Sequence, residues 1–298
     1  MTFSYKRFLN LPKPTKEDFR GDRERILDAL NMPDASMTLE ALRSLYPLTA
    51  RADYAVTVTL CPGDRGTDVI RVEPGDTTHR LLGLALDIGS TTLEMELVDM
   101  VSGQVLGNAG CVNSQVSFGL NILDRILAVK EDRKNLSKLR SLILGDIERL
   151  AAELCASVGR ESVSALVIGG NTTMIHFFLG CDPWLVFQNP YAPVFFDPGI
   201  HSARELGLNL CCNVFCFPAK ANYLGGDITA GTQGRSPLFS WTSAPTASCV
   251  WAAGSFCSWV PGRQGLPWRA SAAATECGRS PGPSGICTLP TTAVFSWM

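Results

Sequence analysis

Residues 82–92, with the sequence LGLALDIGSTT, contain the stretch that decides the fold. The nearly continuous apolar run over 81–88 predicts a buried strand, because both faces of such a strand meet apolar neighbours. Residues 91–100 then alternate apolar and polar side chains, and residues 102–113 follow after a turn at Ser102–Gly103. Together the three segments predict a β-meander.

The rest of the segment 81–232 alternates helix and strand. Helical spacing is present in 121–129 and 136–159, and NTTMIHFFLG (171–180) and NYLGGDITAG (222–231) predict two more helices. SALVIGG (164–170) and NVFCFPA (213–219) predict strands. A three-strand meander followed by this alternation is typical of a ribonuclease-H-like lobe, the unit of actin-like ATPases, so the predicted fold class is α/β.

Upstream of this lobe, residues 23–80 predict a small α+β domain. It has a helix over DRERILDAL, a second helix over MTLEALRSLYP (37–47), and then two alternating strands over 53–60 and 67–76. We expect that Thr38 caps the second helix, that Pro47 stops it, and that Leu39, Leu42 and Leu45 face inward. Residues 1–22 are charged and interrupted by prolines, which predicts an extended linker.

The turn after the first buried strand carries the sharpest chemical signal. Gly89 lets the backbone come close to a phosphate, where a side chain would block it. Ser90, Thr91 and Thr92 offer hydroxyl and backbone N–H groups to phosphate oxygens. Asp87 ends the strand and is suited to hold Mg²⁺ through water, since this ion keeps most of its waters. The alternative interpretation is an ordinary polar hairpin turn.

Two further glycine motifs follow. Gly225 and Gly226 precede Asp227 at a predicted helix start, where backbone N–H groups favour anions. Asp227 is either a second acid near the metal or an ordinary residue of a first helical turn. Gly169 and Gly170 end a strand, where ligand sites of α/β proteins open.

Asn171 follows that second strand and has two interpretations. It could touch the γ-phosphate or its attacking water, or it could be a helix N-cap. We expect His176 to be a packing residue. Cys211, Cys212 and Cys216 form a cluster, for which we favour a structural role over a metal site, because no second Cys/His pair follows with ligand spacing.

Composition limits the partners and the location. The net charge of −2 argues against nucleic-acid and anionic-membrane partners, which need a basic surface. The first 20 residues have no apolar core of a signal peptide, and no apolar run is long enough to span a membrane. We therefore expect a cytoplasmic protein.

Residues 6–232 resemble the ATP-dependent reductive activators of corrinoid proteins. The resemblance is carried by VEPGDTT before GLALDIGSTT, by NSQVSFG and LDRI, by GGNTTMIHFFLG, by NPYAPVFF and by PAKANYLGGDITAG. It implies an actin-like ATPase domain of the acetate kinase, sugar kinase, Hsp70 and actin class. Within the resemblance, residues 1–22 correspond to a linker, 23–80 to a small middle domain and 81–232 to the first ATPase lobe.

The resemblance also implies a reaction. Such activators use ATP and Mg²⁺ to drive an electron onto a Co(II) corrinoid, which returns to Co(I), and the corrinoid protein is the expected partner. In the family the electron enters through a [2Fe–2S] ferredoxin domain. The sequence has no C-x₄-C-x₂-C run for such a cluster, so we expect N-terminal truncation or a separate ferredoxin-type donor. The family usually has an acidic residue near the position of Asn121, which is another departure.

The segment 233–298 departs from the rest of the chain. From Ser240 to Met298, 59 residues hold five of the six Trp, no Lys, no Asp and four charged residues. Five Trp argue against an ordinary disordered tail, since such tails are poor in aromatics. A one-base shift permits 241–248 to encode LDIGTNGE, which resembles a second phosphate loop, and 263–284 to encode an adenosine-loop-like segment. We therefore expect 233–298 to be an out-of-frame, irregular, disordered tail, and the second lobe to be missing.

Four functions are compatible with these observations. The first is an ATP-driven activator of a corrinoid protein, incomplete and inactive alone, with Asp87, Asp227 and Asn171 as its catalytic residues. The second is a non-catalytic, partner-binding fragment, and the third is a pseudogene product. A sugar kinase of the same fold is a weaker fourth, since no sugar-binding acid can be assigned.

Overall fold

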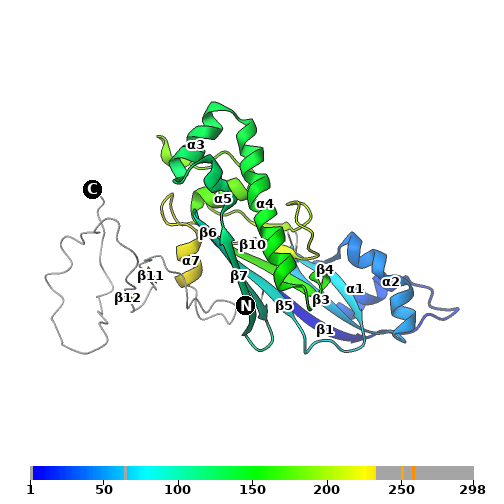
Figure 1. Cartoon of the computed structure of the whole chain (residues 1–298). Helices are drawn as coiled ribbons and strands as arrows, with labels where there is room; N and C mark the ends of the chain where they lie inside the picture. The colour runs from blue at the N-terminus through cyan, green and yellow to red at the C-terminus, as the bar shows by residue number, and fades with distance from the viewer. Residues whose placement is uncertain (1–2, 64–65, 233–249, 252–256, 259–298) are drawn as a thin grey trace, which may run out of the picture.

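The computed structural model describes residues 3–63, 66–232, 250–251 and 257–258. These residues form two adjoining α/β parts, each with its own sheet (Figure 1). The first part holds a four-stranded sheet and the second a six-stranded sheet. The boundary between them lies near residue 80, between the end of β4 at Pro74 and the start of β5 at Leu82.

The four-stranded sheet has the order β1-β3-β4-β2 and is backed by two helices. Apolar side chains of α1 and α2, including Ile26 and Leu45, share one core with Val56, Val58 and Leu60 of β3. The elements are β1 (Tyr5–Asn10), α1 (Asp22–Leu30), β2 (Ala35–Met37), α2 (Leu39–Arg51), β3 (Ala55–Gly63) and β4 (Gly66–Pro74).

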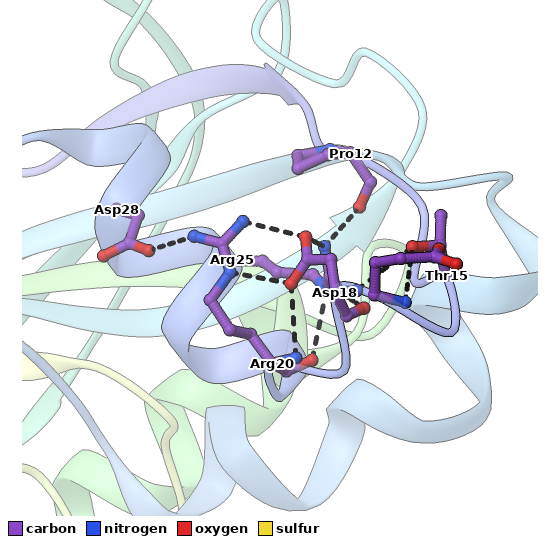
Figure 2. Close-up of polar contacts among 7 residues, drawn as sticks. Pro12, Thr15, Asp18, Arg20, Arg25 and Asp28 are labelled. Atoms are coloured by element: carbon purple, nitrogen blue, oxygen red, sulfur yellow. Dashed lines mark hydrogen bonds and ion pairs between the residues drawn. The ribbon is translucent and has the colours of Figure 1, made fainter.

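The segment predicted as an extended linker is folded onto this first part. Residues 5–10 form β1, which pairs antiparallel with β3. Arg25 of α1 is buried and donates hydrogen bonds to the carbonyl oxygens of Pro12, Asp18 and Arg20 and to the Asp18 carboxylate (Figure 2). A buried guanidinium requires such acceptors, and it therefore holds the polar segment 12–20 in place.

The second helix also differs from its prediction. Thr38 caps it as expected, because its hydroxyl accepts the N–H of Ala41 at 3.3 Å. However, Leu39 and Leu42 are 58% and 41% exposed, and the buried face is formed by Ala41, Leu45 and Thr49. The backbone is non-helical at Tyr46 and Pro47, but the helix resumes after this kink and ends at Arg51. The Thr49 hydroxyl donates to Leu45 O and to the Asp22 carboxylate across the kink.

The six-stranded sheet has the order β7-β6-β5-β8-β10-β9. The first three strands form the predicted antiparallel meander, and β5, β8 and β10 are parallel neighbours, as in a ribonuclease-H-like lobe. The short antiparallel strand β9 extends the edge. The elements are β5 (Leu82–Ile88), β6 (Thr92–Asp99), β7 (Gln104–Val112), the 3-10 helix η1 (Ser114–Phe118), α3 (Ile122–Glu131), α4 (Lys134–Leu154), the 3-10 helix η2 (Arg160–Ser162), β8 (Val163–Gly170), α5 (Thr172–Leu179), α6 (Trp184–Phe187), β9 (Ile200–Ser202), β10 (Asn213–Cys216) and α7 (Gly226–Thr232).

The two faces of this sheet have different coverings. The main core lies on the face crossed by α4, where Leu84, Leu86 and Ile88 of β5 pack with Ile143 and Ile147 (Figure 1). On the other face, Val167 of β8 packs with Ala230 of α7 and with Phe217. Because strand side chains alternate between faces, Ala85 and Asp87 belong to the α7 face.

Polar contacts join the two parts. The Arg71 guanidinium of β4 donates to the carbonyl oxygens of Ser162 and Val163, at 3.2 and 2.6 Å, and to the Ser164 hydroxyl at 3.1 Å. Asn213 of β10 donates to Pro62 O at 2.8 Å. The first part is therefore hydrogen-bonded to the N-terminal end of β8 and to β10.

The remaining described residues are β11 (Val250–Trp251) and β12 (Cys257–Ser258), which pair antiparallel. The predicted out-of-frame, disordered tail of residues 233–298 otherwise lies outside the described residues. Within the part of the chain that the structure describes, no helix is long and apolar enough to cross a membrane.

Candidate functional site

The three glycine-containing motifs meet at one end of the six-stranded sheet. In the parallel pairing of β5 with β8, Asp87 is in register with Gly169, and Ile88 with Gly170. A β-carbon on Gly170 would come within 3.1 Å of Ile88 O, so the two strand ends are in close contact. The carboxyl ends of adjacent parallel strands are where ligand sites of α/β folds open.

The third motif packs directly on this edge. A β-carbon on Gly225 would lie 2.6 Å from the Asn171 α-carbon and 2.9 Å from Gly170 O, which is closer than any side chain tolerates. A β-carbon on Gly169 would lie 3.8 Å from the Asp227 α-carbon. The small residues of both motifs therefore bring the start of α7 against the end of β8.

This packing places two carboxylates on the α7 face. Burial raises the pKa of Asp87 to about 7, and the charges of Asp227 and Glu94 add to this effect. Glu94 of β6 is the residue paired with Asp87 across the β5–β6 hairpin. The pKa of Asp227 is also raised, because the surrounding chain shields its carboxylate although the residue keeps an exposed surface. Two neighbouring acids with raised pKa values are typical of a site that a cation completes.

The turn between β5 and β6 has an unusual arrangement of carbonyl groups. Three consecutive carbonyl oxygens accept hydrogen bonds from Asn113 or Arg125: Gly89 O from Asn113 Nδ2 at 2.8 Å, Ser90 O from Arg125 Nη2 at 2.6 Å, and Thr91 O from the Asn113 backbone N–H at 2.8 Å. In a trans peptide the carbonyl group of one residue and the N–H group of the following residue point in opposite directions. The N–H groups of Ser90 and Thr91 are thus directed away from Asn113 and Arg125.

These N–H groups are available to a ligand. Among residues 3–63 and 66–232, neither the Ser90 nor the Thr91 N–H donates to an acceptor. The Gly89 N–H bonds to Thr92 O at 3.0 Å, and a β-carbon on Gly89 would lie 2.6 Å from that oxygen, which explains the glycine. The turn therefore presents hydroxyl groups of Ser90, Thr91 and Thr92 beside unsatisfied backbone donors, a combination that suits a phosphate.

Asn171 lies at the junction of β8 and α5. Its side-chain oxygen accepts the N–H of Met174 at 3.0 Å, so the helix-cap interpretation is confirmed, whereas a contact with phosphate or water stays a prediction. His176 is fully buried, bonds through Nδ1 to Thr172 O at 2.7 Å, and stacks on Phe195 with ring centroids 4.1 Å apart. It is a packing residue.

Sequence reasoning missed three residues of the site. Glu94, Asn113 and Arg125 had no predicted role, although Asn113 and Arg125 fall within the strings that carried the family resemblance. In the sequence, each of the three is a polar residue beside an apolar run, and that pattern does not reveal its hydrogen-bond partner. Asn121, the other departure from the family pattern, caps α3 by accepting the N–H of Asp124 at 2.8 Å.

The cysteines do not form a metal centre in the part of the chain described. Cys212 and Cys216 are buried and Cys211 is half-buried, all three as free thiols. Across the described ranges, no three His, Cys, Asp or Glu side chains are grouped so that they could hold a metal ion. The described residues therefore do not fit the [2Fe–2S] cluster that the resemblance implies, and Asp87 with Asp227 is no dedicated metal cage.

Comparison with known proteins identifies the family. The model described as RACo middle region matches residues 82–235, more than half of the chain, and the RACo linker region matches residues 3–79. The chain belongs to the RACo family. The two RACo regions divide the chain near residue 80, and their names differ from our expectation, since the linker region includes the small α+β domain.

The chain is similar to part of two longer proteins. The chain is 27% identical over 213 residues to the corrinoid activation enzyme RamQ of Eubacterium limosum, covering 70% of this chain and 35% of RamQ. It is also similar to the solved structure of a reductive activator for a corrinoid, iron–sulfur protein, with a TM-score of 0.68 and 33% identity, covering 77% of this chain and 38% of that one. The chain thus spans little more than a third of each relative.

Proposed function

We propose that this chain supplies the first half of the ATP-phosphate site of a reductive activator of corrinoid proteins. The observation that carries the proposal is the convergence of the three motifs, with Asp87 paired to Gly169 and Gly225 packed on Asn171. In this proposal the turn Gly89–Thr92 binds phosphate oxygens. Asp87 and Asp227 hold Mg²⁺ through its water ligands, and Gly225 and Gly226 allow close backbone approach.

The residues present fit such a ligand. Two unsatisfied N–H groups and three hydroxyl groups of the turn match the acceptor oxygens of a phosphate chain. Mg²⁺ in nucleotide sites is held by one or two carboxylates together with substrate phosphates rather than by a full protein cage. Burial is the main cause of the raised pKa of Asp87, and the charges of Asp227 and Glu94 add to it; a divalent cation beside this carboxylate would favour its charged form.

Each residue then has a separate task. When bound, Mg²⁺ would neutralise phosphate charge. The turn N–H groups would orient the phosphate, and Asp87 and Asp227 would hold the ion. Asn171 has its side-chain oxygen committed to Met174 N–H, so its amide nitrogen is the group left to face a phosphate or an attacking water. These assignments apply to binding and orientation within this lobe.

The activity of the whole protein is proposed from its relatives. By analogy with RamQ and the reductive activator, we propose that ATP binding serves to return a Co(II) corrinoid protein to Co(I), with the electron from a ferredoxin-type donor. A corrinoid protein is the proposed partner and the cytoplasm the proposed location. We expect no appreciable ATP turnover from this chain alone.

A titration with a fluorescent ATP analogue tests the nucleotide site. We expect the full chain to bind it weakly, only with Mg²⁺, and in competition with ATP. The Asp87→Asn variant should bind about tenfold more weakly, since it loses a charge-assisted contact to metal-bound water. Asp99→Asn is the matched control, because it removes one carboxylate from the opposite end of the same hairpin. Equal binding by the two variants would contradict the proposal.

A separate experiment tests the partner. The chain is mixed with a corrinoid protein held in the Co(II) state and analysed by sedimentation. Complex formation supports a role in corrinoid activation. Absence of a complex would remove this chain from partner docking and leave the nucleotide site intact.

A further inference from the structure

Arg125 of α3 is fully buried beside the candidate phosphate turn, although it carries a permanent charge. Its guanidinium donates to Ser90 O at 2.6 Å and to Gly119 O at 3.0 Å. Longer contacts reach Gln115 Oε1 at 3.4 Å and Met174 Sδ at 3.7 Å. No carboxylate in the described ranges forms an ion pair with it. Its charge is instead solvated by neutral acceptors from the β5–β6 turn, from η1 with its C-cap Gly119, and from α5.

The same guanidinium is part of a second layer behind the turn. Asn113 is fully buried, and its Oδ1 accepts the backbone N–H of Gln115 at 2.9 Å, which leaves Nδ2 to hold Gly89 O. Gln115 is also fully buried and donates through Nε2 to Leu139 O of α4 at 2.8 Å. Arg125, Asn113 and Gln115 therefore anchor the turn to η1, α3 and α4 without any contact on its outer side.

We propose that Arg125 is a positioning residue for the phosphate turn. By holding the carbonyl oxygen of Ser90, it directs the Thr91 N–H away from itself, while Asn113 does the same for the Ser90 N–H by holding Gly89 O. The proposal rests on the function proposed above, since it assigns the purpose of this orientation to phosphate binding. It is distinct from the contacts of Asp87 and Asp227, because Arg125 reaches the ligand only through the backbone of the turn.

If Arg125 only stabilised the fold, its replacement would lower stability without moving the backbone of the phosphate turn. Arg140 of α4 offers the comparison, because its guanidinium also donates to two backbone carbonyl oxygens, Phe178 O at 3.2 Å and Leu206 O at 2.7 Å. Neither acceptor belongs to the phosphate turn. Loss of Arg140 should therefore reduce stability without altering the turn, whereas loss of Arg125 should alter the turn itself.

The experiment compares the amide resonances of Ser90 and Thr91 in the full chain by nitrogen-15 NMR, first without ligand. We expect Arg125→Met to shift or broaden both resonances and Arg140→Met to leave them in place. Arg125→Lys keeps the charge and one possible donor to Ser90 O, so it should restore part of the native positions. If Arg125→Met does not fold, the Arg125→Lys spectrum decides. Unchanged Ser90 and Thr91 resonances in the folded variants would overturn the proposal.

The second arm adds Mg·ATP. In the native chain the Ser90 and Thr91 resonances should move on titration, and Arg125→Met should need about tenfold more Mg·ATP for the same response, with Arg140→Met close to native. An equal response of the two variants would contradict the positioning role. If the native chain does not respond, the proposed nucleotide site fails, while the ligand-free spectra still decide whether Arg125 sets the turn.

Discussion

Asp87 and Gly169 are paired residues at the ends of two adjacent parallel strands, and Asp227 lies across from them at the start of α7. A β-carbon at Gly169 would lie 3.8 Å from the Asp227 α-carbon, an ordinary contact distance, which shows how closely the start of α7 approaches the end of β8. This arrangement keeps a carboxylate in partly dehydrated surroundings. The folded chain without its ligand is expected to lose stability at this point, as is common at binding sites.

The first prediction concerns the free energy of unfolding that is lost by burying the Asp87 carboxylate. Because the folded pKa of Asp87 is about 7 and its ordinary value is 3.8, the folded protein takes up the proton more readily than the unfolded chain. The contribution of Asp87 to stability therefore falls as pH rises between these two values. Asp87→Asn removes this dependence and should raise the free energy of unfolding by about 1–3 kcal/mol at about pH 8. Urea unfolding in the presence of a chelator measures it.

The same measurement at lower pH is its control. At about pH 4 Asp87 is protonated in the folded protein, so the advantage of Asp87→Asn should shrink toward zero. A variant that is no more stable than the native chain at the higher pH would show that the carboxylate is not held in a dehydrated position.

A second prediction tests the contact between the second and third glycine motifs. Gly225→Ala places a β-carbon 2.6 Å from the Asn171 α-carbon, and backbone must shift to accept it. We expect a loss of about 1–3 kcal/mol in the free energy of unfolding, because overpacking of this size is seldom absorbed without strain. Weaker Mg·ATP binding should accompany it.

Gly145→Ala is the matched control. Gly145 lies on the exposed side of α4, with nothing within 4 Å of an added β-carbon. Alanine is the better helix former there, so this variant should gain about 0.5–1 kcal/mol. A Gly225→Ala variant as stable as the native chain, or stabilised as Gly145→Ala is, would refute the close approach at Gly225.

A third prediction concerns the joint between the two parts of the chain. Arg71→Met leaves the carbonyl oxygens of Ser162 and Val163 without their shared donor, and should lower the free energy of unfolding by about 2–4 kcal/mol. Arg204→Met removes an exposed ion pair with Glu40 and should cost at most about 1 kcal/mol. Thermal unfolding compares the two variants, and equal losses would argue against a stabilising contact between the two parts at half-buried Arg71.

The lobe could be predicted well from the sequence because its signals are local. The apolar run over 82–88 and the alternation after it give β5 and β6, and the helical spacing from 136 onward gives α4. The short edge strands β2 and β9 were missed, because three residues carry no readable period. The prediction of an extended linker over residues 1–22 missed β1 and the contacts of Arg25 with Pro12 and Asp18, because no local pattern reveals pairing with β3 or the position of Arg25.

The candidate site shows the same division. Asp87, the turn Gly89–Thr92 and the two glycine pairs could be predicted, because each motif is contiguous and the topology brings them together. Arg125 could not, since a polar residue on a short helix is usually a solvated one. The prediction that Leu39 and Leu42 face inward was wrong. Their apolar spacing predicted burial, but the buried face of α2 is formed by Ala41, Leu45 and Thr49.

Hydrogen–deuterium exchange of the full chain with Mg·ATP tests most directly whether the three motifs form one phosphate site. We expect slower exchange in three separate segments at once: residues 87–92, 169–173 and 225–229. Mg²⁺ with adenosine, which lacks the phosphates, should protect none of them. Protection of only one segment, or of none, would contradict the shared site on which the proposed function depends.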